Sequence, residues 1–153
     1  LSRRQRQLCI RDRIYEDFFS EMHYRYPDRV GLTIGFVPEL SKKIYAGADM
    51  FLMPSQSEPC GLAQMIALRY GTIPIVRETG GLRDSIHDAG DKNGNGFTFK
   101  SYNAHDMLDA VVRARAYYDD KMKWGRLVNT ALKQNFSWTK SAKDYIALYN
   151  DIH

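Results

Sequence analysis

Residues 49–77 read DMFLMPSQSEPCGLAQMIALRYGTIPIVR, and this stretch decides the fold. It opens with a short apolar run that Pro54 stops, which is typical of a buried strand. After a polar loop, residues 61–70 place apolar side chains at helical spacing, and Gly71 closes the expected helix. Residues 72–77 are again apolar and partly β-branched, which predicts a second strand. Strand, loop, helix and strand in this order form the unit from which parallel sheets are built.

The same alternation extends in both directions from this stretch. Upstream we predict a helix that begins at Ile14 and ends at Tyr26 and Pro27. A strand is expected over 29–36 (RVGLTIGF). A second helix is expected to begin at Pro38 and Ser41 and to run through Ala48. Downstream we predict a turn at Gly80 and Gly81, a short helix near 82–86, a loop over 88–96, a short strand over 97–99, and three helical segments after the N-cap candidate Asn103.

This alternation predicts an α/β fold in which a doubly wound parallel sheet is followed by a helical C-terminal tail. Ligand sites in such sheets form in the loops that follow the carboxyl ends of the strands. Three loops of this kind can be located, at 35–39, 54–61 and 78–82.

Residues 54–64 (PSQSEPCGLAQ) form the most informative loop, since it leaves a strand and enters a helix at Gly61. The first turn of a helix presents unpaired N–H groups and a partial positive charge, which favour an anion such as pyrophosphate. Glu58, just before this turn, is suited to accept hydrogen bonds from sugar hydroxyls. The spacing equally allows a second interpretation, in which Glu58 is only a helix-cap acid and Gly61 only a turn.

The loop over 78–84 (ETGGLRD) repeats this arrangement. A strand ends at Arg77, two glycines form a tight turn, and a short helix follows. A lone Gly-Gly pair usually marks only a turn. Two strand–glycine–helix junctions at one edge of a sheet are a better indication of phosphate binding.

Composition places the chain among globular proteins. Its 153 residues are enough for one domain, and 44% are hydrophobic and 26% charged. No apolar run approaches the roughly 18 to 20 residues that a membrane helix needs. The two cysteines, Cys9 and Cys60, cannot form a disulfide framework, which favours a reducing compartment.

The net charge of +4 comes from the amino-terminal segment, because four of the 22 basic residues fall within residues 1–11, which hold no acid. The remaining 18 basic residues equal the 18 acidic ones, whereas a nucleic-acid-binding domain is expected to spread basic residues over a folded face. Residues 1–13 (LSRRQRQLCIRDR) resemble the translation of a sequencing-library adapter. We therefore expect this segment to be an artefact or a disordered basic tag; the alternative is a basic arm that binds phosphate or a membrane.

Several longer segments resemble one enzyme family. SEPCGLAQMIALRYGTIPIVRETGGLRDSI (57–86) is similar to the C-terminal half of bacterial glycogen synthases and plant starch synthases. GFVPELSKKIYAGADMFLMPS (35–55) and NGNGFTFKSYNAHDML (93–108) are similar to the family segments that precede and follow it. The resemblance covers residues 14–153, and the EPCGL and TGGL pair at this separation is highly specific.

The resemblance implies the donor-binding part of a retaining glucosyltransferase with two Rossmann-like domains, the GT-B type. Such enzymes move glucose from ADP-glucose to the non-reducing end of an α-1,4-glucan. They need no metal or other cofactor, since helix dipoles and basic side chains neutralise the diphosphate. The family's Lys-Gly motif and its N-terminal domain would precede Ile14. We therefore expect residues 14–153 to be a truncated C-terminal nucleotide-sugar-binding domain that is inactive without the missing N-terminal domain of the same enzyme.

The resemblance also assigns roles to single residues. Glu58 matches the acid that holds the donor glucose hydroxyls and helps to stabilise an oxocarbenium-like state. Phe36 matches an aromatic residue near the adenine, although a core phenylalanine at a strand end fits equally well. The remaining matched positions belong to the loops near the glucose and the diphosphate: Pro59, Cys60, Gly61, Leu62, Thr79, Gly80 and Gly81. A second glutamate found in the wider superfamily is absent, because Ile66 occupies its position.

Two other functions remain open. A related transferase that uses UDP-glucose is disfavoured by the EPCGL form of the loop. A non-catalytic module that binds phosphate or nucleic acid would depend on residues 1–11 alone. The expected partners are thus ADP-glucose and an α-1,4-glucan, with no nucleic acid and no membrane. The expected location is the bacterial cytoplasm, or the plastid for a plant protein.

The remaining reactive or aromatic residues favour structural interpretations. Cys60 has no histidine or asparagine placed beside it by sequence, which disfavours a thiolate nucleophile. The four histidines lack metal-ligand spacing, and His105 is expected on a helix surface. Trp124 and Trp138 are expected in the core or in a domain contact. The basic residues between Arg113 and Arg126 are expected to form a solvated helix face.

Overall fold

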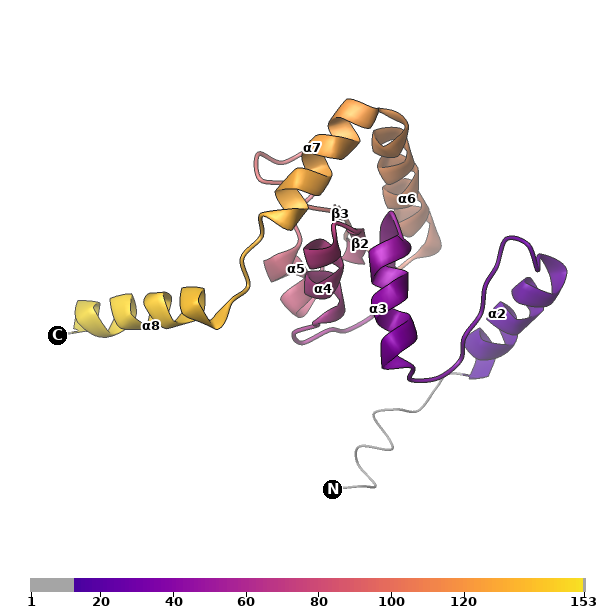
Figure 1. Ribbon diagram of the computed structural model, residues 1–153, viewed down its shortest axis with the longest axis horizontal. Coiled ribbons are helices and arrows are strands. Elements are labelled where there is room, and N and C mark those ends of the chain that lie inside the picture. The colour runs from indigo at the N-terminus through magenta and orange to yellow at the C-terminus, as the bar shows by residue number, and fades with distance from the viewer. Residues whose placement is uncertain (1–12, 153) are drawn as a thin grey trace, which may run out of the picture. The chain divides into compact units, whose positions relative to one another are not determined.

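The computed structural model describes residues 13–152 and divides into two compact units, Leu1–Pro38 and Glu39–His153 (Figure 1). The described part of the first unit holds helix α2 (Arg13–Arg25), as the apolar spacing predicted. Tyr26 ends this helix, and its carbonyl oxygen accepts hydrogen bonds from the N–H groups of Arg29 and Val30. Residues 1–12, which carry most of the segment that resembles an adapter, lie outside the described residues.

The predicted strand over 29–36 is wrong. Residues 30–37 contain no strand, and among residues 13–152 no other strand pairs with them. A strand exists only when its N–H and C=O groups enter a ladder with a neighbour, so a β-branched composition alone does not form one. The segment also contributes no buried side chain, which removes the second source of strand stability.

The second unit contains a parallel three-stranded sheet. Its strands are β1 (Met50–Met53), β2 (Ile73–Arg77) and β3 (Phe97–Phe99), in the spatial order β1-β2-β3. Both pairings are parallel, with Leu52 opposite Ile75 and Arg77 opposite Phe99. The three strands fall within the predicted segments, and the α/β fold class is confirmed. Because all strands run in one direction, the loops that follow them lie along one edge of the sheet.

The helices of this unit lie near their predicted positions (Figure 1). They are α3 (Pro38–Gly47), α4 (Ala63–Tyr70), α5 (Gly80–Ser85), α6 (Ala104–Asp119), α7 (Lys121–Leu132) and α8 (Trp138–Ile152). Helix α4 ends at Gly71, which adopts the left-handed conformation with φ 79°. The side chain of Asn103 caps α6 by accepting a hydrogen bond from the Asp106 N–H, as predicted. Helix α5 begins at Gly80 rather than at the predicted Leu82, because the two glycines form its first turn.

One hydrophobic core joins the sheet to α4, α5, α6 and α7. Helices α4, α6 and α7 pack on β2, and α6 also packs on β3. The central side chains, including those of Leu68, Ile73, Val76 and Phe97, are almost completely buried. Trp124 on α7 joins this core, whereas Trp138 on α8 is exposed. The hydrophobic core therefore fixes the carboxyl ends of the strands, and the loops that follow them begin there.

Candidate functional site

The loop after β1 and the loop after β2 touch each other through their backbones. The Gly81 N–H donates a hydrogen bond to the Glu58 carbonyl oxygen at 3.1 Å. A Cβ at Gly80 would lie 2.1 Å from that same oxygen, and a Cβ at Gly81 would lie 2.1 Å from the Cys60 oxygen. No side chain fits at either position, since real Cβ atoms do not approach backbone so closely. The two glycines therefore permit the close contact between the loops.

A buried glutamine fastens the two loops from beneath. Gln64, in the first turn of α4, is completely buried. Its Nε2 donates to the carbonyl oxygens of Gly61 at 2.9 Å and Cys60 at 3.2 Å, and to the Ser85 Oγ at 3.1 Å. The Ser85 hydroxyl in turn donates to the Gly81 carbonyl oxygen at 2.6 Å. A continuous set of hydrogen bonds thus runs from the first loop, through Gln64, to the second.

The structure brings together every predicted site residue of these two loops. They lie over residues 58–62 and 79–81, beside the first turns of α4 and α5. Glu58 is half-buried, and Pro59, Cys60 and Leu62 are exposed. Among residues 13–152 no side chain caps α4 or α5, so the amides of their first turns depend on backbone or ligand partners. The Gly81 amide is already used by Glu58, and it is not free to bind a phosphate in this arrangement.

Phe36 belongs to the first unit, and 90% of its surface is exposed. It is therefore not a core phenylalanine, which was one of its two interpretations. Its predicted role near an adenine stays a prediction.

Arg77, the last residue of β2, contacts the loop after β1 directly. Its Nε donates to the Ser55 carbonyl oxygen at 3.0 Å, and its Nη2 donates to the Gln56 carbonyl oxygen. Its guanidinium also lies over the ring of Tyr102, 5.7 Å from the ring centre. In the sequence, Arg77 is recognisable only as the end of a strand, because no local pattern indicates which backbone groups its side chain reaches.

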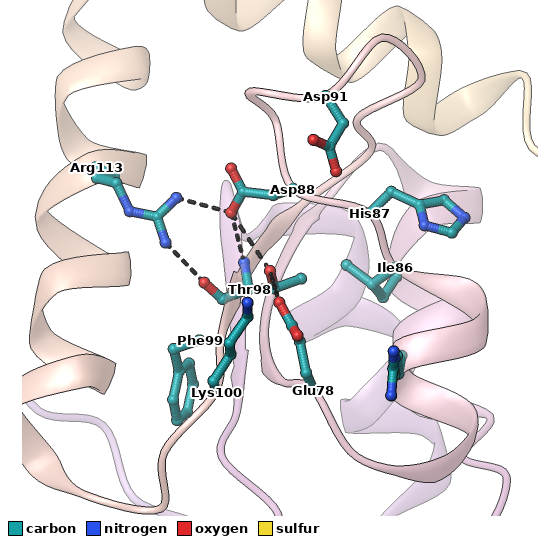
Figure 2. A pocket seen from close by; sticks show the side chains of 10 residues that line it. Glu78, Ile86, His87, Asp88, Asp91, Thr98, Phe99, Lys100 and Arg113 are labelled. Atoms are coloured by element: carbon teal, nitrogen blue, oxygen red, sulfur yellow. Dashed lines mark hydrogen bonds and ion pairs between the residues drawn. The ribbon is translucent and has the colours of Figure 1, made fainter.

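A second polar cluster lies beside the site, around a pocket of about 590 Å³ (Figure 2). Arg113 on α6 binds Asp88 Oδ2 through Nη1 and the Thr98 carbonyl oxygen through Nη2, both at 2.7 Å. Thr98 donates its hydroxyl to Glu78 Oε1 at 2.8 Å. Of this cluster, Glu78 directly precedes the Thr79–Gly81 segment, but none of the residues predicted from sequence to bind substrate lines the pocket.

The electrostatics of this cluster centre on Asp88. Burial alone would raise the pKa of its carboxyl group, but hydrogen bonds from Arg113, Thr98 and Gly90 outweigh burial and hold the pKa below its ordinary value. The pKa of Arg113 is raised, because its bonds to Asp88 and Asp109 outweigh its own partial burial. The expectation that Arg113 belongs to a solvated face is therefore wrong: its ion pair turns it toward the Asp88 loop, over the ring of Phe97.

Other expectations concern residues away from the loops. His105 is exposed on α6, as predicted, and Cys60 has a free, exposed thiol. Within residues 13–152, no three histidine, cysteine or acidic side chains are grouped so that they could hold a metal ion. The same residues form no helix long and apolar enough to cross a membrane.

Comparison with known proteins identifies the family. The family described as glycosyl transferases group 1 matches residues 22–126, about two thirds of the chain. The chain belongs to this family. The match includes α3, the whole sheet, both loops of the candidate site and the Arg113–Asp88 pair.

Glycogen synthases are among the similar proteins. The chain is 54% identical over 140 residues to the glycogen synthase of Anoxybacillus flavithermus and 54% identical over 143 residues to that of Bacillus anthracis. These matches cover 90% and 92% of this chain, but only 29% and 30% of the relatives. The chain therefore spans a little under a third of the length of the curated relatives it matches.

A solved structure gives the same relationship. The catalytic domain of starch synthase IV from Arabidopsis thaliana, bound to ADP and acarbose, superimposes with a TM-score of 0.76 and 40% sequence identity. This superposition covers 88% of the present chain and 29% of the starch synthase chain. The resemblance to glycogen and starch synthases that the sequence motifs predicted is confirmed.

Proposed function

We propose that this chain forms the nucleotide-sugar-binding part of a retaining glucosyltransferase that moves glucose from ADP-glucose to the non-reducing end of an α-1,4-glucan. The contact between the Glu58 loop and the Gly80–Gly81 loop is the observation that supports this proposal most. It places a carboxylate-bearing residue beside the first turns of two helices at the carboxyl edge of a parallel sheet. The ADP in the similar starch synthase IV structure supports the choice of nucleotide.

Each part of the proposed site has a physical task. Free amides in the first turn of α4 would stabilise the negative charge that grows on the leaving ADP. Glu58 would accept hydrogen bonds from glucose hydroxyls, and its charge would oppose the positive charge that grows on the anomeric carbon. Thr79 and Gly80 would line the diphosphate, whereas the Gly81 amide keeps its bond to Glu58.

The remainder of the proposal concerns substrates and location. The α-1,4-glucan acceptor would be bound mainly by an N-terminal domain. The similar glycogen synthases are long enough to contain such a domain, because the match covers only 29–30% of their length. ADP-glucose is a substrate, and we propose no cofactor, no nucleic-acid partner and no membrane partner. The proposed location is the bacterial cytoplasm, or the plastid for a plant protein.

A graft experiment tests this function. Residues 14–153 would replace the matching segment of the Bacillus anthracis glycogen synthase, and transfer to glycogen would be measured with radiolabelled ADP-glucose and UDP-glucose. We expect transfer from ADP-glucose, with a much lower kcat/KM for UDP-glucose. Preference for UDP-glucose would favour the alternative donor. A folded graft that binds ADP but transfers glucose from neither donor would contradict the proposal.

A further inference from the structure

The loop that carries Glu58 has no regular secondary structure between β1 and α4, so something else must fix its path. Arg77 supplies two hydrogen bonds to it, from Nε to the Ser55 carbonyl oxygen and from Nη2 to the Gln56 carbonyl oxygen. A third, longer bond runs from Nη1 to the Lys100 carbonyl oxygen at 3.4 Å. One side chain at the end of β2 thus joins the segments that follow β1 and β3.

The backbone of Arg77 is held in the sheet by strand pairing, so its side chain starts from a fixed position. Its backbone belongs to β2 and pairs with Phe99 of β3. Its guanidinium lies over the Tyr102 ring at 5.7 Å, a cation–π contact that restricts the side chain further. The side chain is only half-buried, but within the described part of the chain its hydrogen bonds all go to backbone carbonyl oxygens. A planar fork of donors matches such a set of acceptors, whereas a lysine ammonium could reach one or two of them.

We propose that Arg77 is a positioning residue that holds residues 55–58 against the carboxyl edge of the sheet and so fixes where Glu58 lies. Its bonds reach Ser55 and Gln56, three and two residues before Glu58. From the other side, the Gly81 N–H binds the carbonyl oxygen of Glu58 itself. Glu58 is therefore held between an anchor ahead of it and an anchor on its own backbone. The claim that Arg77 fixes the loop is independent of the proposed function. Only its consequence for catalysis by Glu58 rests on that function.

Hydrogen–deuterium exchange on the 153-residue chain tests this role without any activity assay. In Arg77→Met we expect the Gly81 amide to exchange roughly tenfold faster, because its acceptor, the Glu58 carbonyl oxygen, lies on the loop that loses two hydrogen bonds. The amides of residues 73–76 and 97–99, in the core of the sheet, should keep their rates. Arg77→Lys should restore part of the protection, because an ammonium still reaches one carbonyl.

A matched control separates this role from a general loss of charge. Arg115→Met also removes an arginine that hydrogen-bonds and lies over an aromatic ring, Tyr118, but on the exposed surface of α6. It should leave the exchange of the Gly81 amide unchanged. If Arg77→Met does not fold, Tyr102→Ala removes only the exposed aromatic ring beneath the guanidinium and should speed exchange of the Gly81 amide by roughly threefold.

A spin label on Cys60 gives an independent spectroscopic signature of the same loop. Cys9→Ser leaves Cys60 as the single thiol of the chain, and Cys60 is exposed. Arg77→Met should raise the mobile component of the label spectrum, and Arg77→Lys should lower it again. Two results would overturn the proposal: unchanged exchange and mobility in Arg77→Met, or an equal rise of exchange in the core strands. The graft could fail to transfer glucose while these results stood, so the two proposals fail separately.

Discussion

The N–H of Gly81 and the carbonyl oxygen of Glu58 are joined by a hydrogen bond of 3.1 Å, which ties the start of one helix to the loop before another. Glycine is required there for steric reasons, because a Cβ at residue 81 would lie 2.1 Å from the backbone oxygen of Cys60. The two loops can lie this close only because residue 81 has no side chain. A substitution of Gly81 therefore tests the contact.

Gly81→Ala should separate the loops and destabilise the fold. The added methyl group would overlap backbone atoms, which cannot rotate away as a side chain does. Overpacking of this kind costs about 1–3 kcal/mol in the free energy of unfolding, measurable by urea denaturation. Gly125→Ala is the matched control, since a Cβ there meets nothing within 4 Å on helix α7. It should raise stability by about 0.5–1 kcal/mol. Equal effects of the two variants would contradict the steric account.

Glu58→Gln should lower kcat far more than it weakens ADP binding. The substitution keeps the shape and an acceptor oxygen but removes the charge that would oppose the developing positive charge. Loss of one comparable preorganised electrostatic contact costs roughly 10²- to 10³-fold in kcat. The measurement is steady-state kinetics of the graft with ADP-glucose, together with calorimetric binding of ADP. A kcat within a few-fold of the parent would contradict the proposed role of Glu58.

Arg113→Met should lower the free energy of unfolding by about 1 kcal/mol at pH 7, a modest value because both partners are partly exposed. The folded-state pKa of Asp88 lies below its ordinary value of 3.8, so the pair stabilises the fold above that pH. This stabilisation is lost as the pH falls through the lowered folded-state pKa. The difference between parent and variant should therefore shrink below about pH 4, in urea titrations across this range.

The control for this prediction is Arg115→Met, which removes the exposed pair with Asp119 on the same helix. It should produce no measurable change in stability at either pH. A pH-independent loss in Arg113→Met would assign its effect to packing on Phe97 rather than to the charge of Asp88.

The 153-residue chain alone should transfer no glucose from ADP-glucose to glycogen. It spans 29–30% of the similar glycogen synthases, and the resemblance places the acceptor-binding domain and the Lys-Gly motif in the remainder. Incorporation of labelled glucose above background by the purified chain would contradict this prediction. A mixture with the separately expressed N-terminal part of a relative would show whether the missing domain restores transfer.

The strands could be predicted wherever the sequence marks both of their ends. Pro54 stops β1, Gly71 separates α4 from β2, and both strands lie within the predicted segments. The segment over 29–36 is also apolar and partly β-branched but is not a strand, because pairing depends on a neighbour that local sequence cannot supply. The parallel order also placed the Glu58 and Gly80–Gly81 loops at one edge correctly, while the roles of their residues stay predictions.

The side-chain anchors could not be predicted in the same way. Arg77 reaches Ser55 across 22 residues and Arg113 reaches Asp88 across 25, and no periodic pattern links such positions. Arginine is usually solvated, so its type alone favours a surface interpretation. Only the local pair of Arg113 with Asp109, four residues apart on α6, has a signal in the sequence.

The buried amide of Gln64 has a kinetic consequence. It bonds to Cys60 and Gly61 on one loop and, through the Ser85 hydroxyl, to Gly81 on the other. Neither loop can move outward alone without breaking hydrogen bonds of the completely buried Gln64 side chain. The two loops should therefore open as a single body with one shared exchange rate, and relaxation-dispersion measurements should return the same rate constant at Gly61 and Gly81. The rates of ligand entry and release would then be limited by the motion of segments other than these two loops.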